Sequence, residues 1–277
     1  MAAQGLHISI SAEPIATIGG FAVTNSIFTS LIVSTILILF AIIANSQLKQ
    51  TDKPKGMQNF AEWLVETFQN FIYSVTGNFK KTRLFLPLVT TFFLWIALNN
   101  WLGLVPGVGT ISVVHEQEPI AATTVNAAYA QELELEPETE AEPHLIKVPV
   151  FRPGTADLNT TIALAIFSVF ATQIFGIQAQ SLGYFKKFFN FTNPIMFFVG
   201  ILELISEFAK IISFAFRLFG NIFAGEVLLV VIAFLVPIIV PMPFYGLELF
   251  VGFIQALVFA MLSLVFFNMA TQSHDDH

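Results

Sequence analysis

The sequence contains no cysteine, which excludes a disulfide framework, a thiolate nucleophile and any metal site built on cysteine ligands. Charged residues are also scarce. They make up 11% of the 277 residues, whereas hydrophobic residues make up 55% and the mean hydropathy is +0.75. Soluble domains carry about 25% charged residues. The composition is therefore that of a polytopic membrane protein, for which the bilayer is the main solvent.

The short motifs of nucleotide-using and hydrolytic enzymes are absent as well. The stretch GNIFAG (220–225) lacks the lysine and the strand-to-helix context of a phosphate-binding loop, and the sequence has no HExxH, nucleophile elbow or Rossmann fingerprint. We therefore expect a non-catalytic protein with no cofactor, no metal and no nucleic-acid partner. Any energy conversion would occur through partner proteins.

Long apolar runs indicate a single all-α membrane domain covering residues 1–277. The predicted elements are three transmembrane spans, an amphipathic helix on the cytoplasmic surface, an acidic external loop and a long, strongly tilted helical hairpin embedded in the membrane. In chain order they are a span at 21–44, the surface helix at 57–75, a span at 84–105, the loop at 106–156, a span at 157–180 and the hairpin at 194–236 and 243–271.

The hairpin is unusual because its first helix is too long for an upright span. An apolar helix of more than forty residues from Pro194 measures roughly 60 Å, whereas about 20 residues cross the hydrocarbon core. We expect this helix to tilt strongly or to break near Gly220 or Gly225. The PMP sequence from Pro241 to Pro243 is expected to form the turn of the hairpin.

The segment 57–75 alternates with helical period between an apolar and a polar face. Its apolar side chains are predicted to lie along one line, whereas its glutamates and amides point largely elsewhere. That line comprises Phe60, Leu64, Phe68, Phe71 and Val75. The pattern favours a helix lying on the membrane surface. A helix docked on a soluble partner is the alternative.

Basic residues set the predicted orientation. Eight of the twelve lysines and arginines fall in residues 45–83 or in the loop with Lys186 and Lys187, and these segments are therefore predicted to be cytoplasmic. This places the N-terminus outside and the C-terminus inside. The external loop carries a run of alternating glutamates from Glu132 to Glu142, which predicts a solvated acidic segment.

A polar stripe runs along the first helix of the hairpin. Glu203, Lys210 and Arg217 recur every seven residues, and Ser206, Ser213 and Asn221 lie close to the same line. A charge at bilayer depth costs roughly 2.5–3.5 kcal/mol on insertion scales, so these groups should face protein or water. The simpler alternative is an arginine that pairs with a buried glutamate to lock two helices together.

The remaining polar groups point in a second direction. Glu226 is nine residues from Arg217 and lies on the opposite side of an ideal helix, whereas Glu248 and Gln255 share one face of the second helix. A guanidinium stays charged and cannot relay protons, but carboxylates, amides and hydroxyls with trapped water can. The division favours a fixed cation between two hydrated half-paths. The alternative is that Glu226 and Glu248 are protonated acids that fasten helices, and packing alone could account for Asn221 and Gln255.

Several stretches of the sequence resemble subunit a of the rotary F-type ATP synthase, and the similarity covers nearly the whole chain. The most specific is RLFGN followed by AGE, within RLFGNIFAGEVLL (217–229). The others are ELISEFAK (203–210), PGTADLN (153–159), NNWLGLVPG (99–107) and FIQALVFAMLSLVF (253–266). The resemblance implies a stator protein whose tilted hairpin lies against a rotating ring of c subunits, with a peripheral stalk of b subunits and the lipid bilayer as further partners.

The resemblance also implies roles for individual residues. Arg217 matches the arginine that faces each c-ring carboxylate in turn. The matched half-channel positions are Asn221, Glu226, Glu248 and Gln255, the matched exit positions are Glu203, Ser206 and Lys210, and Asp157 matches an outer aspartate. The chain departs from many members in having glutamate at both 226 and 248 instead of a glutamate and histidine pair. Its acidic loop, about 111–148, is also longer than usual.

Three alternatives remain open at this stage. The same machine could be driven by sodium, since the ring supplies the ion site. A self-contained secondary transporter would show internal repeats or paired broken helices, which the sequence lacks. The absence of a transit segment favours a bacterial plasma membrane over an organellar inner membrane.

Overall fold

The structure is a computed structural model of the whole chain. It describes residues 12–19, 21–48, 56–105, 112–116, 145–181, 183–184, 188, 193–236 and 239–272. Some predictions fall outside these residues. They concern the basic residues at 49, 53 and 55, the acidic run from 132 to 142, the lysine pair at 186 and 187, and the last residues of the C-terminal tail.

Long helices dominate the described part of the chain, as predicted. Five of them are long and apolar enough to cross a membrane: α1 (Asn25–Gln47), α3 (Phe79–Gly103), α5 (Leu158–Gln180), α6 (Pro194–Leu235) and α7 (Pro241–Ala270). The sixth, α2 (Met57–Thr76), is the predicted amphipathic helix. The protein is therefore a helical membrane protein with several candidate spans.

The first span begins later than predicted, because residues 21–24 are extended. Strand β1 (Pro14–Ile18) pairs antiparallel with β2 (Phe21–Thr24), and α1 follows directly. The Thr24 hydroxyl accepts a hydrogen bond from the Ile27 amide at 3.4 Å and so caps the first turn. Apolar content alone does not separate a short strand from the start of a helix.

The predicted loop at 106–156 contains more regular structure than expected. Strands β3 (Ser112–Glu116) and β4 (Leu145–Pro149) form an antiparallel hairpin, and the 3₁₀ turn η2 (Gly154–Ala156) leads into α5. The β-branched residues in SVVHE and LIKVP favour strands. The prediction of a loop without regular structure was wrong for these two segments, since the surrounding glutamates dominated the composition.

Two helix boundaries also differ from the predictions. Helix α3 starts five residues early, because the Asn78 side chain accepts hydrogen bonds from the amides of Lys80 and Lys81 and so caps it. Helix α7 starts at Pro241, so the predicted turn over the PMP sequence was wrong. A proline is readily accommodated at the first helical position, where its missing N–H has no partner to lose.

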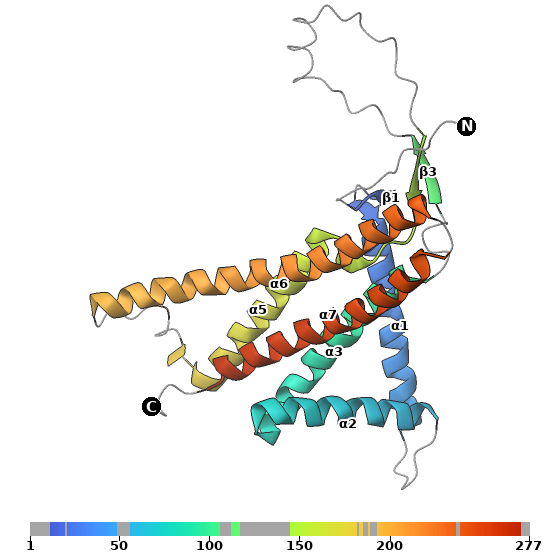
Figure 1. Cartoon of the computed structure of the whole chain (residues 1–277). Coiled ribbons are helices and arrows are strands. Elements are labelled where there is room, and N and C mark those ends of the chain that lie inside the picture. Colours follow the sequence, from blue (N-terminus) through green and yellow to red (C-terminus); the bar gives the residue numbers. More distant parts are fainter. Residues whose placement is uncertain are drawn as a thin grey trace, which may run out of the picture.

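Helix α6 is continuous over 42 residues, without a break at Gly220 or Gly225. It forms an antiparallel hairpin with α7, and α3 and α5 pack against this pair (Figure 1). At one end of the bundle lie the two β-hairpins, and at the other end α2 lies across α1 and α3 (Figure 1). The tilt of the hairpin in a bilayer remains a prediction.

The interior of the bundle is packed with aromatic and small side chains. Phe85, Phe259 and Phe267 are almost fully buried, and Phe259 lies 4.9 Å from Phe214, ring centre to ring centre. Helices α5 and α7 approach closely enough for Ser168 and Ser263 to share a 2.7 Å hydrogen bond. In lipid such packing and hydrogen bonds hold helices together, because the lipid tails are as apolar as the side chains.

The buried face of α2 is only partly the predicted one. Phe68 and Ile72 are buried against the bundle and Leu64 is partly buried, but Phe60 is half exposed. Phe60 lies away from this core and contacts Phe40 of α1, with 6.0 Å between the ring centres. Whether α2 rests on lipid or on another protein remains a prediction.

Candidate functional site

The hairpin carries a groove beside Arg217. The groove has a volume of about 240 Å³ and lies between α6 and α7, lined by Ser206, Lys210, Ser213 and Arg217 together with apolar residues such as Phe266. The structure therefore brings four members of the predicted stripe together along one surface. They come from successive turns of α6, which explains why a seven-residue period identified them.

Arg217 is exposed on this surface of the isolated chain. Its Nη2 atom donates a long hydrogen bond of 3.4 Å to the Ser213 hydroxyl, one turn earlier on the helix. Within the described residues, no carboxylate lies within ion-pair distance of this guanidinium. The alternative in which Arg217 locks two helices through a buried glutamate is therefore not supported.

Lys210 belongs to a chain of polar contacts that leads away from the groove. Its Nζ forms a 2.8 Å ion pair with buried Glu207, and it lies 4.7 Å from the centre of the Phe266 ring. The second Glu207 oxygen accepts a 3.0 Å hydrogen bond from Gln173 of α5, whose own oxygen accepts one from the Tyr184 hydroxyl. These contacts tie α6 to α5 near the C-terminal end of α5.

Tyr184, which lies beyond the end of α5, also belongs to this series of polar contacts. Burial and the nearby carboxylates of Glu207 and Glu203 raise the pKa of the Tyr184 hydroxyl to about 12, so it is a protonated donor at neutral pH. Glu203 is partly exposed and lies one turn before Glu207 on α6. The sequence placed Glu207 on the hairpin but did not select it as a site residue, since its partner Gln173 lies on another helix.

Asn221 and Gln255 join the two helices of the hairpin near its middle. The Asn221 amide donates a 2.7 Å hydrogen bond to the Gln255 side-chain oxygen. Gln255 is 4% exposed, and its Nε2 atom has no hydrogen-bond partner among the described residues. An unsatisfied buried amide is costly, so this position is suited to a water molecule or a group supplied by a partner.

Glu248 is buried against the α6 backbone at Gly225. A Cβ atom built on Gly225 would lie 2.0 Å from a carboxylate oxygen of Glu248, so only glycine leaves room for this side chain in its present position. Glu248 is 8% exposed. Gly225 therefore leaves room for the Glu248 side chain. The helix does not break there, contrary to one of the expectations from the sequence.

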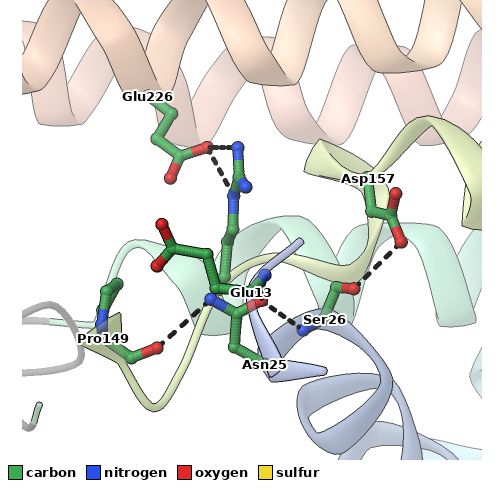
Figure 2. A network of polar contacts seen from close by, with 7 residues as sticks. Glu13, Asn25, Ser26, Pro149, Asp157 and Glu226 are labelled. Carbon is green, nitrogen blue, oxygen red and sulfur yellow. Dashed lines mark hydrogen bonds and ion pairs between the residues drawn. The ribbon is translucent and has the colours of Figure 1, made fainter. Parts of the chain in front are cut away.

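Glu226 points out of the hairpin toward the chain segment before α5. One of its oxygens, Oε2, contacts both Nε of Arg152 at 3.2 Å and Nη2 of Arg152 at 3.1 Å (Figure 2). Arg152 is 5% exposed, whereas Glu226 is 32% exposed. The sequence analysis identified Glu226 as a candidate site residue but not Arg152.

Asp157 lies near this pair but has its own partners. Its carboxylate accepts a 3.0 Å hydrogen bond from the Ser26 hydroxyl at the start of α1 (Figure 2). It also accepts a 3.1 Å hydrogen bond from the Asn159 amide. The predicted capping of α5 is therefore confirmed. The three acids assigned to the outer region have separate partners, since Glu226 binds Arg152, Asp157 binds Ser26 and Glu248 lies against Gly225.

The segment that carries Arg152 is fastened to the first turns of α1. Asn25 donates through its side-chain amide to the Pro149 carbonyl at 3.2 Å (Figure 2). The Arg152 amide donates to the Thr29 hydroxyl at 3.3 Å. Two residues further on, Gly154 passes so close to α1 and α3 that a Cβ atom would lie 2.0 Å from the Ser30 hydroxyl. These contacts fix the backbone from which Arg152 reaches α6.

The fold and its polar clusters define a class of protein. It is a helical membrane protein with polar clusters at two levels of one long hairpin and an exposed guanidinium between them. No cluster of potential metal ligands occurs among the residues that the structure describes. The carboxylates, amides and hydroxyls of the polar clusters can bind and pass protons or carry ions along the protein.

Comparison with known proteins identifies the family. The family model described as ATP synthase A chain matches residues 27–268, and the chain belongs to this family. A relative named ATP synthase subunit a, from Gloeobacter violaceus, is 30% identical over 273 residues, covering 99% of this chain and 92% of the relative. A chloroplastic ATP synthase subunit a from Stigeoclonium helveticum is 31% identical over 261 residues, covering 93% and 89%.

Proposed function

We propose that this chain is the proton-translocating stator subunit of an F-type ATP synthase. It would provide two aqueous half-channels beside a ring of c subunits and couple proton flow to rotation of that ring. Membership of the ATP synthase A chain family supports the assignment to the complex. The proton paths and the ring contact are proposals that depend on the residues of the hairpin.

One observation carries the proposal: Arg217 is exposed in the middle of a membrane-spanning helix and has no acidic partner within the described residues. A permanent charge in that position faces a large penalty in lipid unless another protein covers it. A c-ring carboxylate is the partner that would satisfy it. Arg217 would also block direct proton leakage between the two half-channels.

The outer half-channel would use Asp157, Glu226 and Glu248, with Asn221 and Gln255 nearer the ring. A proton entering there would neutralise a ring carboxylate, which could then turn into the lipid. After nearly a full rotation it would release its proton to the inner half-channel near Glu203, Ser206 and Lys210. Each charge that crosses gains about 2.3 kcal/mol per 100 mV, and this energy drives rotation only if leakage is blocked.

The orientation follows from the distribution of charge and structure. Lys80, Lys81 and Arg83 lie at the end of the bundle that holds α2, so this end would be cytoplasmic, with the β-hairpins outside. The C-terminal end of α7 would then lie inside. A bacterial plasma membrane is the proposed location, and the peripheral-stalk b subunits are the proposed second partner.

The test is ATP synthesis by the purified complex in vesicles under an imposed proton gradient. Arg217→Ala should reduce synthesis at least about a hundredfold, as expected when a central electrostatic group is removed. Arg83→Ala is the matched control, since Arg83 is exposed at the start of α3 and outside the proposed paths. Normal proton-driven synthesis by the Arg217 variant would overturn the proposal, and synthesis driven only by a sodium gradient in the unaltered complex would replace proton by sodium.

A further inference from the structure

Arg152 is a buried cation that neither the sequence nor the proposed proton path accounts for. It belongs to the segment before α5, outside the hairpin, and its backbone is fastened to α1 through Thr29. Its side chain extends from this anchored backbone to Glu226 on α6 (Figure 2). A long-range contact of this kind fixes one element relative to another.

The contact leaves the two oxygens of Glu226 unequal. Both contacting nitrogens of Arg152 lie against Oε2, at 3.2 and 3.1 Å, so Oε1 takes no part in the pair. The Glu226 side chain remains about one third exposed while the arginine is almost fully buried. The pair therefore restrains the carboxylate without sealing it from its surroundings.

An ion pair in which only one partner is buried is weak evidence for a role in stability alone. Desolvation of the two charges offsets much of their attraction, and well-packed apolar residues often serve stability equally well. A planar guanidinium, however, holds a carboxylate in a defined orientation better than a flexible ammonium does.

We propose that Arg152 is a positioning residue for proton entry, which holds Glu226 by Oε2 and leaves Oε1 to exchange protons. This rests on the proposed role of Glu226 in the outer half-channel. Arg152 itself stays charged and carries no proton along the path. It acts on proton entry through Glu226, so its removal should slow proton uptake little further once the Glu226 carboxylate is absent.

A double-mutant cycle in the complete ATP synthase tests this directly. The variants are Arg152→Gln, Glu226→Gln and the two combined. Each is assembled in the complete complex, the soluble sector is then stripped from the vesicles, and passive proton uptake through the remaining membrane sector is measured. Each single change should lower uptake about tenfold, within the range of coupling energies between residues in contact. The double variant should remain within about twofold of Glu226→Gln, whereas independent contributions would multiply to about a hundredfold.

Arg152→Lys provides the graded control, because it keeps the charge but loses the fork of two donors. It should recover part of the uptake lost in Arg152→Gln. If Arg152→Gln does not assemble, as judged by subunit content and ATP hydrolysis, Arg152→Lys in the presence and absence of Glu226→Gln carries the same cycle. Multiplicative losses in either cycle would overturn the positioning role.

The outcomes separate this inference from the proposed function. If Glu226→Gln slows uptake but Arg152→Gln does not, the positioning role is wrong and the path through Glu226 stands. If Glu226→Gln leaves uptake unchanged, both the positioning role and the outer path through Glu226 are wrong, whereas the role of Arg217 is still tested by its own variant. Faster uptake in Arg152→Gln would show that the arginine restrains entry, which also contradicts the inference.

Discussion

Two arginines on or near the same helix occupy opposite environments. Arg152 is almost fully buried and paired with Glu226, whereas Arg217 is exposed and donates only a long hydrogen bond to Ser213 among the described residues. The charge of Arg152 has its ion-pair partner within the same chain. An exposed charge at membrane depth requires a partner from outside. The difference agrees with the proposal that the contacts around Arg152 are complete within the chain, whereas the groove beside Arg217 is completed by another protein.

The largest expected loss of stability comes from removing Glu207, which tests whether the contacts among Lys210, Glu207 and Gln173 hold α6 against α5. Glu207→Ala should lower the free energy of unfolding by about 2–3 kcal/mol, because Lys210 and Gln173 lose a buried acceptor. Glu207→Gln should lose less, since it can still accept hydrogen bonds. Thermal unfolding of the purified complex measures both, and equal stability of Glu207→Ala and the unaltered protein would contradict the packing described for this region.

Gly225→Ala tests the outer region through its close contact with Glu248. The added methyl group would displace the carboxylate while the flexible side chain absorbs the collision, so assembly should persist and ATP synthesis should fall about tenfold. Glu248→Asp shortens the side chain and should restore part of the activity in the double variant. Gly246→Ala is the matched control on α7, because a Cβ there meets no atom within 4 Å. Full activity of Gly225→Ala would show that the position of Glu248 is unimportant.

Substitutions of Asp157 distinguish the effect of helix capping from the effect of charge, and they have the smallest expected effect on stability. Asp157→Ala should cost about 1 kcal/mol of stability, because the free amide of Asn159 at the start of α5 loses its acceptor. Asp157→Asn should keep most of that stability, since asparagine is an equally good cap. Unfolding experiments compare the two variants. A slower proton uptake in Asp157→Asn would then report on charge alone, and equal destabilisation by both changes would contradict a capping role.

The sequence predicted local features well and contacts between distant segments poorly. The length of α6, the extent of α5 and the cap at Asp157 all depend on neighbouring residues, and the structure agrees with each of them. The prediction that α7 starts only at residue 243 was wrong, because the proline pair was interpreted as a turn although proline also begins helices. Periodicity could identify Arg217 because its neighbours in the groove lie on the same helix.

Arg152 shows why part of the site could not be predicted. Its partner Glu226 is 74 residues away, and the contact depends on a segment fastened to α1 by Asn25 and Thr29. No spacing rule relates positions on separate elements. A single arginine in an acidic stretch, five residues before a capping aspartate, was the available signal, and without the packing it did not distinguish a site residue from a solvated one.

The most direct test of the central claim is to identify what covers Arg217 in the assembled complex. The chain has no cysteine, so Ser213→Cys beside Arg217 can carry a short photoactivated crosslinker, with Thr35→Cys on the exposed side of α1 as the matched control. We predict that the probe at 213 attaches to the c subunit near its membrane carboxylate and that the probe at 35 does not. Attachment of the probe at 213 to lipid alone, or to the c ring only from position 35, would contradict the account.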